Sequence, residues 1–150
     1  MEDSRQTTVL FADVSGSTKL YETAGDAAAL TAIGHCIERM RKAAESTGGR
    51  VVKTIGDEIM ALFPSPDAAA GAASEMHATI EQLPEVGGSK LGVRVGFHSG
   101  PVIQRDDDVF GDTVNMAARL VEQAGKGQII ISHETAELFK IGRASCRERV

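Results

Sequence analysis

Residues 51–63 read VVKTIGDEIMALF, two runs rich in β-branched and apolar residues on either side of one Gly-Asp pair. This pattern predicts a β-hairpin over residues 50–63, with its tight turn at that pair. Folding an apolar hairpin requires no carboxylate, yet Asp57 stands at the turn and Lys53 stands four residues earlier on the incoming strand. We therefore interpret Asp57 as one half of a metal site whose other half is Asp13.

Outward from the hairpin, the spacing of apolar residues predicts strands and helices in the order β-α-β-β-α-β, which is the ferredoxin-like unit. The flanking elements are a strand over 7–12, a helical region over 17–46 with a break near Gly25, a helix over 68–83 and a strand over 91–98. In the first helical region the expected apolar stripe consists of Leu30, Ile33, Ile37 and Met40.

Further elements follow this core towards the C-terminus. The sequence predicts a short strand over 102–103, an acidic loop over 106–108, a helix over 112–124, a strand over 128–131 and a helix over 132–139. The predicted fold class is therefore α+β, with a ferredoxin-like βαββαβ core and additional C-terminal β/α elements.

Residues 1–140 are predicted to form a single domain, because a chain of 150 residues has the usual length of one. The last ten residues, 141–150, carry three arginines, no apolar period and no capping residue. We expect this segment to be a non-native tail, which would leave the domain incomplete at its C-terminus.

The net charge of −5 disfavours a protein that binds a nucleic-acid backbone, which needs a basic face. A polyanionic substrate can still bind if a cation shields it. No apolar run approaches the ~20 residues that cross a bilayer, so no membrane segment is expected in this chain. The two cysteines, Cys36 and Cys146, form neither a disulfide framework nor a metal motif, which indicates a reducing cytoplasm.

The topology of the predicted sheet turns two distant aspartates into one site. In a ferredoxin-like sheet the first and third strands are antiparallel neighbours, so Asp13 at the end of one lies beside Asp57 at the start of the other. Two such carboxylates repel unless a cation lies between them, and oxygen ligands suit Mg²⁺ or Mn²⁺ completed by waters and substrate phosphates. The alternative is that Asp13 caps a turn or a helix and Asp57 is only a favourable turn residue.

Two further patterns suit a phosphorylated ligand. Gly16, Ser17 and Thr18 follow Asp13 and can present backbone N–H groups at a helix N-terminus, which is a phosphate-sized site, although most such turns only cap helices. Asn115 and Arg119 are four residues apart and share a helix face that suits a sugar oxygen and a phosphate. The alternative for this pair is a solvated helix surface.

Three charged side chains complete the candidates. Arg94 alternates with valines, as a solvent-facing strand residue also does. Lys53 and Asp108 are a donor and an acceptor that can read a purine edge, although each alone is typical of a protein surface. Glu58 is expected to point to the face opposite Asp57 and not to bind metal, and His98 is expected to be structural.

Four segments together resemble the catalytic domain of the class III nucleotidyl cyclases. They are FADVSGST at 11–18, KTIGDE at 53–58, RVGFHSGP at 94–101 and DVFGDTVNMAAR at 108–119. The resemblance covers roughly residues 7–140, and the four motifs occur in the family's order with compatible spacing.

The resemblance implies an adenylate cyclase that converts ATP to 3′,5′-cyclic AMP and pyrophosphate with two Mg²⁺ or Mn²⁺ ions per site. By position, it implies that metal is bound by Asp13, Asp57 and Val14, that the triphosphate is contacted by Arg94, and that catalysis depends on Asn115 and Arg119. Lys53 and Asp108 match the base-selecting pair in its adenine-type form, since the guanine-type form typically has Glu and Cys.

The resemblance also implies a head-to-tail homodimer with twofold symmetry. Each pocket would combine Asp13, Asp57 and Arg94 of one chain with Lys53, Asp108, Asn115 and Arg119 of the other. A further triphosphate-binding lysine of the family lies beyond the point where the odd tail begins, and no residue here fills that position. We therefore expect this fragment by itself to be weakly active or inactive.

Other readings stay open, the plainest of which is a purely structural partner domain. The domain could be a non-catalytic nucleotide-binding or dimerisation module, although all seven implied positions are filled. It could be a guanylate cyclase with a different base preference. A diguanylate-cyclase-like enzyme is disfavoured, because residues 55–58 read IGDE and lack the double glycine of that signature.

Overall fold

The computed structural model describes residues 3–139, so the predicted tail at 141–150, with Cys146, lies outside the described residues. The strands are β1 (Asp3–Ser15), β2 (Arg50–Ile55), β3 (Glu58–Phe63), β4 (Gly92–Arg105), β5 (Asp108–Phe110) and β6 (Ile129–Ile131). The helices are α1 (Ser17–Ala24), α2 (Asp26–Ser46), α3 (Pro66–Glu81), α4 (Asp112–Gln123) and α5 (His133–Glu137). Within this part of the chain, no helix is long and apolar enough to cross a bilayer.

The strands form one sheet in the order β2-β3-β1-β4-β5, with β6 paired beside β4. The central strand β1 runs antiparallel to both β3 and β4, whereas β6 runs parallel to β4. The first and third strands are therefore neighbours, as predicted, and the α+β fold class is confirmed.

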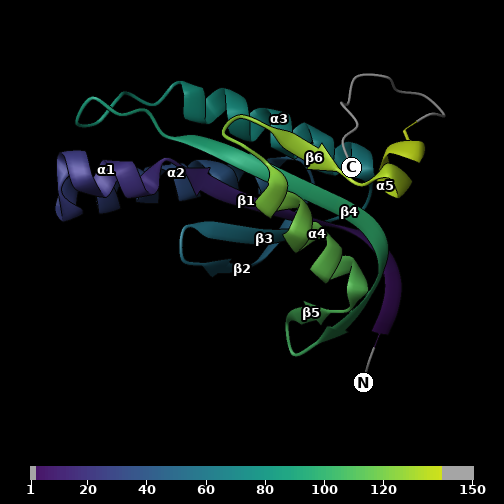
Figure 1. The fold of residues 1–150 in the computed structure, drawn as a ribbon. Helices are drawn as coiled ribbons and strands as arrows, with labels where there is room; N and C mark the ends of the chain where they lie inside the picture. Colours follow the sequence, from purple (N-terminus) through teal and green to yellow (C-terminus); the bar gives the residue numbers. More distant parts are fainter. Residues whose placement is uncertain (1–2, 140–150) are drawn as a thin grey trace.

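Helices cover both faces of the sheet, with α2 and α3 on one face and α4 on the other (Figure 1). Along β1 the side chains alternate: Leu10 and Ala12 pack with α2 and α3, whereas Val9 and Phe11 pack with α4. A central strand that is covered on both sides is apolar on both sides, which explains the unbroken hydrophobic run before Asp13.

Helix α4 lies very close to β4 at Gly96. A Cβ atom at Gly96 would stand 2.4 Å from the backbone nitrogen of Val121, so any larger residue would push the helix off the sheet. This close approach brings the loop after α4 over the end of the sheet where Asp13 and Arg94 lie.

The predicted strands at 91–98 and 102–103 are one continuous strand, β4, so the prediction of two strands was wrong. Pro101 does not interrupt it, because its carbonyl accepts a hydrogen bond from the Thr113 hydroxyl at 2.7 Å, away from β1. The N and C=O of one strand residue point to the same side, so the missing N–H of Pro101 removes no bond to β1.

The predicted acidic loop at 106–108 is shorter than expected. Asp106 and Asp107 have φ angles of 53° and 65° and form the two-residue turn of the β4–β5 hairpin. Positive φ at both central residues matches the twist of a tight hairpin, and Asp tolerates this region better than most residues. Asp108 is instead the first residue of β5.

The predicted stripe on α2 was wrong at one position. Leu30 is 59% exposed, whereas Ala29, Ile33 and Met40 are buried against the sheet and α3. Leu30 lies about 100° around the helix from Ala29, and that rotation is enough to leave the core-facing stripe.

Candidate functional site

Strand register places three charged residues in a row across the sheet. Asp13 pairs with Glu58 on β3 at one side and with Arg94 on β4 at the other. Directly paired residues of antiparallel strands project to the same face, and for these three it is the face covered by α4. Asp57 immediately precedes β3, and its carbonyl accepts the Val14 N–H at 3.0 Å, so the two predicted metal aspartates lie side by side.

A hollow of about 470 Å³ opens at this end of the sheet. We call it the Asp13 hollow; it is lined by residues 13–18, Asp57, Arg94 and residues 124–126. It contains every predicted metal-binding and phosphate-binding residue from β1, the β1–α1 turn, the β2–β3 turn and β4. The structure therefore assembles one group of the sequence-predicted site residues in a single concave surface.

Arg94 is oriented by Asp13. Its Nε and Nη2 atoms both donate to Oδ2 of Asp13, at 2.9 and 2.7 Å. The side chains are 31% and 14% exposed, so the pair lies partly out of water, where such a contact is screened less than at a surface. Arg94 is thus not a free solvent-facing strand residue, which was the alternative reading of its position.

Asp13 and Asp57 repel each other in this arrangement. Burial raises the pKa of Asp13, the hydrogen bonds from Arg94 lower it, and the nearby charge of Asp57 raises it again, with a net upward shift. Ser17 donates to Oδ2 of Asp57 at 2.8 Å and holds that carboxylate towards the hollow. A cation between the carboxylates would relieve the repulsion that burial makes worse.

The donor set fits a hard divalent cation. Among the described residues, no three His, Cys, Asp or Glu side chains gather as a complete protein-only metal cluster. Mg²⁺ commonly takes only one or two carboxylates and completes its shell with waters and substrate phosphates. Val14 is 4% exposed and has no side-chain ligand atom, so only its backbone carbonyl could serve as the predicted ligand.

The β1–α1 turn has the backbone geometry of an anion site. Gly16 is the N-cap of α1 with φ of 97°, a conformation that favours glycine, and it supplies no capping side chain. Gly16 therefore does not cap the backbone N–H groups of Ser17 and Thr18 in the first turn of α1. Both residues line the Asp13 hollow. Such groups and the helix dipole attract a phosphate.

The predicted base-reading pair is formed from two distant strands. Lys53 Nζ on β2 donates to Oδ2 of Asp108 on β5 at 2.9 Å. The hydrogen bond from Lys53, followed by one from the Val109 N–H, lowers the pKa of Asp108. Both side chains are partly exposed, at 42% and 29%, so their polar atoms are accessible to a ligand.

Asn115 and Arg119 lie on the exposed side of α4. The helix buries Thr113, Ala117 and Leu120 against the fold, and it leaves Asn115 and Arg119 exposed one turn apart. We call Lys53, Asp108, Asn115 and Arg119 the exposed set. None of these four lines the Asp13 hollow, so one chain carries the predicted site as two separate groups.

The sequence reasoning misjudged Glu58, which lies beside the hollow, and missed Lys126, which lines it. Glu58 faces the same side as Asp13, and burial together with the charge of Asp13 raises its pKa to about 7. The rule that successive strand residues face opposite sides does not apply to Asp57 and Glu58, because Asp57 lies in the turn and not in the strand.

Lys126 contributes a cation to the rim of the hollow. Its stem lies over Gly92, where a Cβ would stand 2.7 Å from Cγ of Lys126, and its Nζ donates to the Lys90 carbonyl. The only sequence signal was a lysine between two glycines before a strand, which by itself predicts nothing about the site.

Comparison with known proteins gives a family match. The family model described as "Adenylate and Guanylate cyclase catalytic domain" matches residues 1–149. An adenylate cyclase of Streptomyces coelicolor is 33% identical over 137 residues, covering 89% of this chain, and one of Streptomyces griseus is 33% identical over 145 residues, covering 93%. The chain spans 34% of the length of each of these relatives.

Solved structures show the same architecture. The adenylyl cyclase CyaB from P. aeruginosa superposes with a TM-score of 0.78 at 26% identity, covering 95% of this chain and 84% of that one. The catalytic core of a rhodopsin-guanylyl cyclase with converted specificity, in complex with ATPalphaS, gives a TM-score of 0.83 at 25% identity, covering 93% and 84%.

Proposed function

Because the chain belongs to the adenylate and guanylate cyclase catalytic domain family, we propose that it is an adenylate cyclase that converts ATP to 3′,5′-cyclic AMP and pyrophosphate. The observation that carries the proposal is the juxtaposition of Asp13 and Asp57, with Arg94 and the N-terminus of α1, in one hollow. Two carboxylates, a guanidinium and free backbone N–H donors together suit a nucleoside triphosphate with its metal ions.

In the proposed reaction the ribose 3′-oxygen attacks the α-phosphorus in line. A P–O bond forms to that oxygen, the bond to the bridging oxygen of the β-phosphate breaks, and pyrophosphate leaves while the hydroxyl proton is lost to solvent. When bound at Asp13 and Asp57, two Mg²⁺ or Mn²⁺ ions would lower the pKa of the hydroxyl and neutralise phosphate charge.

The residues of this chain would bind and orient the substrate. The Gly16–Thr18 turn and Arg94 would hold phosphate oxygens, with the Arg94 guanidinium shared between Asp13 and the ligand. Ser17 would keep the Asp57 carboxylate in its observed position through the 2.8 Å hydrogen bond. Lys53 and Asp108 would read adenine, whose edge offers both an acceptor and a donor.

The proposal includes a homodimer with shared sites. The exposed set and the Asp13 hollow are separate on one chain, so a complete site needs both groups brought together by a second copy. In such a dimer Asn115 of the partner subunit would orient the ribose, and Arg119 of the partner subunit would meet the charge that develops on the reacting phosphate.

The test is to incubate the purified full-length protein with Mn²⁺ and either ATP or GTP and to identify the products by mass spectrometry. We expect cyclic AMP and pyrophosphate in equal amounts, and much less cyclic GMP. Cyclic GMP as the main product would contradict the base assignment. Nucleotide binding without any cyclic product would instead favour a non-catalytic module.

A further inference from the structure

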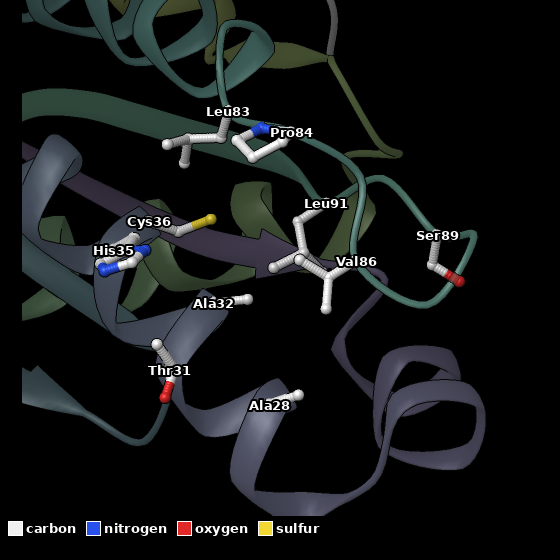
Figure 2. A pocket seen from close by; sticks show the side chains of 10 residues that line it. All are labelled: Ala28, Thr31, Ala32, His35, Cys36, Leu83, Pro84, Val86, Ser89 and Leu91. Atoms are coloured by element: carbon white, nitrogen blue, oxygen red, sulfur yellow. The ribbon is translucent and has the colours of Figure 1, made fainter.

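A second cavity lies on the other face of the sheet, away from the Asp13 hollow. It has a volume of about 360 Å³ and lies between α2 and residues 83–91, the segment that joins α3 to β4 (Figure 2). None of its lining residues belongs to the candidate nucleotide site. Ligand pockets in proteins have volumes from about 300 Å³ upwards, so the cavity is large enough for a small molecule.

The walls of the cavity are mostly apolar. Ala28, Ala32 and Cys36 contribute from α2, at the spacing of one helix face, and Leu83, Val86 and Leu91 stand opposite (Figure 2). Ala28 and Ala32 have short side chains that do not reach across the space, so no side chain fills it. No Asp, Glu, Lys or Arg lines the cavity, and its polar lining consists of Thr31, His35 and Ser89, so a phosphate or other strong anion would find no lysine or arginine there.

A buried polar group without a partner points into this space. Cys36 is 1% exposed, and Figure 2 shows its sulfur directed from α2 towards Leu83 and Leu91. Its thiol makes no hydrogen bond to any residue in the described range 3–139. Burial raises the pKa of Cys36 to about 11, so the group is a neutral thiol that can meet a ligand but adds no charge.

We propose that this cavity binds a small, uncharged apolar molecule. We further propose that the bound molecule restricts the motion of the β1–α1 turn through its contacts with residues 83–91. The cavity is too small for an amphipathic helix, whose diameter with side chains is about 10 Å. The lack of a lysine or arginine among the lining residues disfavours nucleotides and other phosphate-bearing ligands as its occupants.

The link to the β1–α1 turn consists of the close approach of residues 83–91 to both ends of α1, together with a 3.4 Å contact between the Thr23 and Ser89 hydroxyls. Leu91, which lines the cavity, has its Cδ2 atom 3.7 Å from the position of a Cβ at Gly16. Gly87 is pressed against Ala24 at the end of α1, since a Cβ there would lie 2.8 Å from that of Ala24. An occupant that orders residues 83–91 would therefore restrict α1 at both of its ends.

The test uses N-phenyl-1-naphthylamine, an uncharged aromatic probe whose fluorescence rises in apolar surroundings. We expect saturable binding to the wild-type protein at one probe per chain. Ala32→Leu and Ala28→Phe fill the cavity from within and from its edge, and each should weaken binding at least about tenfold, because the space is taken by a side chain. Ala27→Phe, one residue away on an exposed side of α2, is the matched control and should bind as the wild type does.

Hydrogen exchange tests the second half of the inference. Saturating probe should slow amide exchange in residues 83–91 and in α1, and should leave β5 unchanged. Failure of the wild type to bind the probe saturably overturns the cavity assignment, as does unchanged binding in both filled variants. Binding without slower exchange in α1 overturns the link to the turn, and none of these outcomes depends on cyclase activity.

Discussion

The Asp13 hollow and the exposed set differ in how the fold holds their charged groups. In the hollow, Asp13 comes from β1, Arg94 from β4 and Asp57 from the β2–β3 turn, and hydrogen bonds join Arg94 to Asp13 and Ser17 to Asp57. In the exposed set, Asn115 and Arg119 stand on a solvent-facing helix surface. The difference teaches that one chain preorganises the groups proposed to bind phosphate, whereas the setting of Asn115 and Arg119 depends on what covers α4.

The largest effect should come from the interior of the hollow. Asp57→Ala removes a proposed metal ligand and should lower turnover by about 10³-fold or more, because the charge on the phosphates is no longer offset. Cyclic AMP formation with Mn²⁺ and ATP is the measurement. Glu45→Ala, at an exposed position of α2, is the control, and thermal unfolding should show that both variants fold. Turnover by Asp57→Ala near the wild-type rate would remove Asp57 from the metal site.

Mixing two inactive variants tests whether the exposed set belongs to a partner's site. Asp57→Ala and Arg119→Ala chains should each be inactive alone, because every site then lacks one group. An equimolar mixture should recover about a quarter of wild-type activity, since half of the dimers are mixed and each mixed dimer has one intact site. If activity stays at zero after the chains have exchanged, the Asp13 hollow and the exposed set must act within one chain, and the exposed set does not belong to a partner's site.

Exchange of the base-reading pair should have a smaller effect. Lys53→Glu with Asp108→Cys replaces the donor by an acceptor, and should shift the ratio of kcat/KM for ATP over GTP by about 10- to 100-fold towards GTP. Each single variant is the control, since it breaks the 2.9 Å ion pair without exchanging the roles. An unchanged ratio in the double variant would mean that these two side chains do not read the base.

The smallest effect is expected at the rim of the hollow. Lys126→Met keeps the stem over Gly92 but removes the charge, and should raise KM for ATP by about 3- to 10-fold with little change in kcat, as loss of a ground-state phosphate contact does. Lys42→Met, an exposed position on α2, is the matched control. Equal KM values in the two variants would show that Lys126 only packs on the fold and makes no contact with the nucleotide.

Much of the site's framework could be predicted because it depends on local signals. The Gly-Asp turn at 56–57 separates two apolar runs, and the structure places β2 and β3 on either side of it. The ferredoxin-like order then makes β1 and β3 neighbours, which brings Asp13 beside Asp57 without any knowledge of side-chain packing. The ion pairs Lys53–Asp108 and Arg94–Asp13 could not be predicted from the order of strands alone, because they also depend on strand register.

Residue periodicity and turn chemistry by themselves determined the order of elements, the fold class and the place of Asp13 at a strand end and of Asp57 at a turn, because these follow from short-range backbone preferences. Only the tertiary structure decided that β4 passes unbroken through Pro101, that Glu58 faces Asp13, that Lys126 lies over Gly92 and that α2 leaves a cavity beside Cys36. Each of these depends on contacts between segments far apart in the chain, where close packing and strand register, and not local pattern, determine which side chains meet.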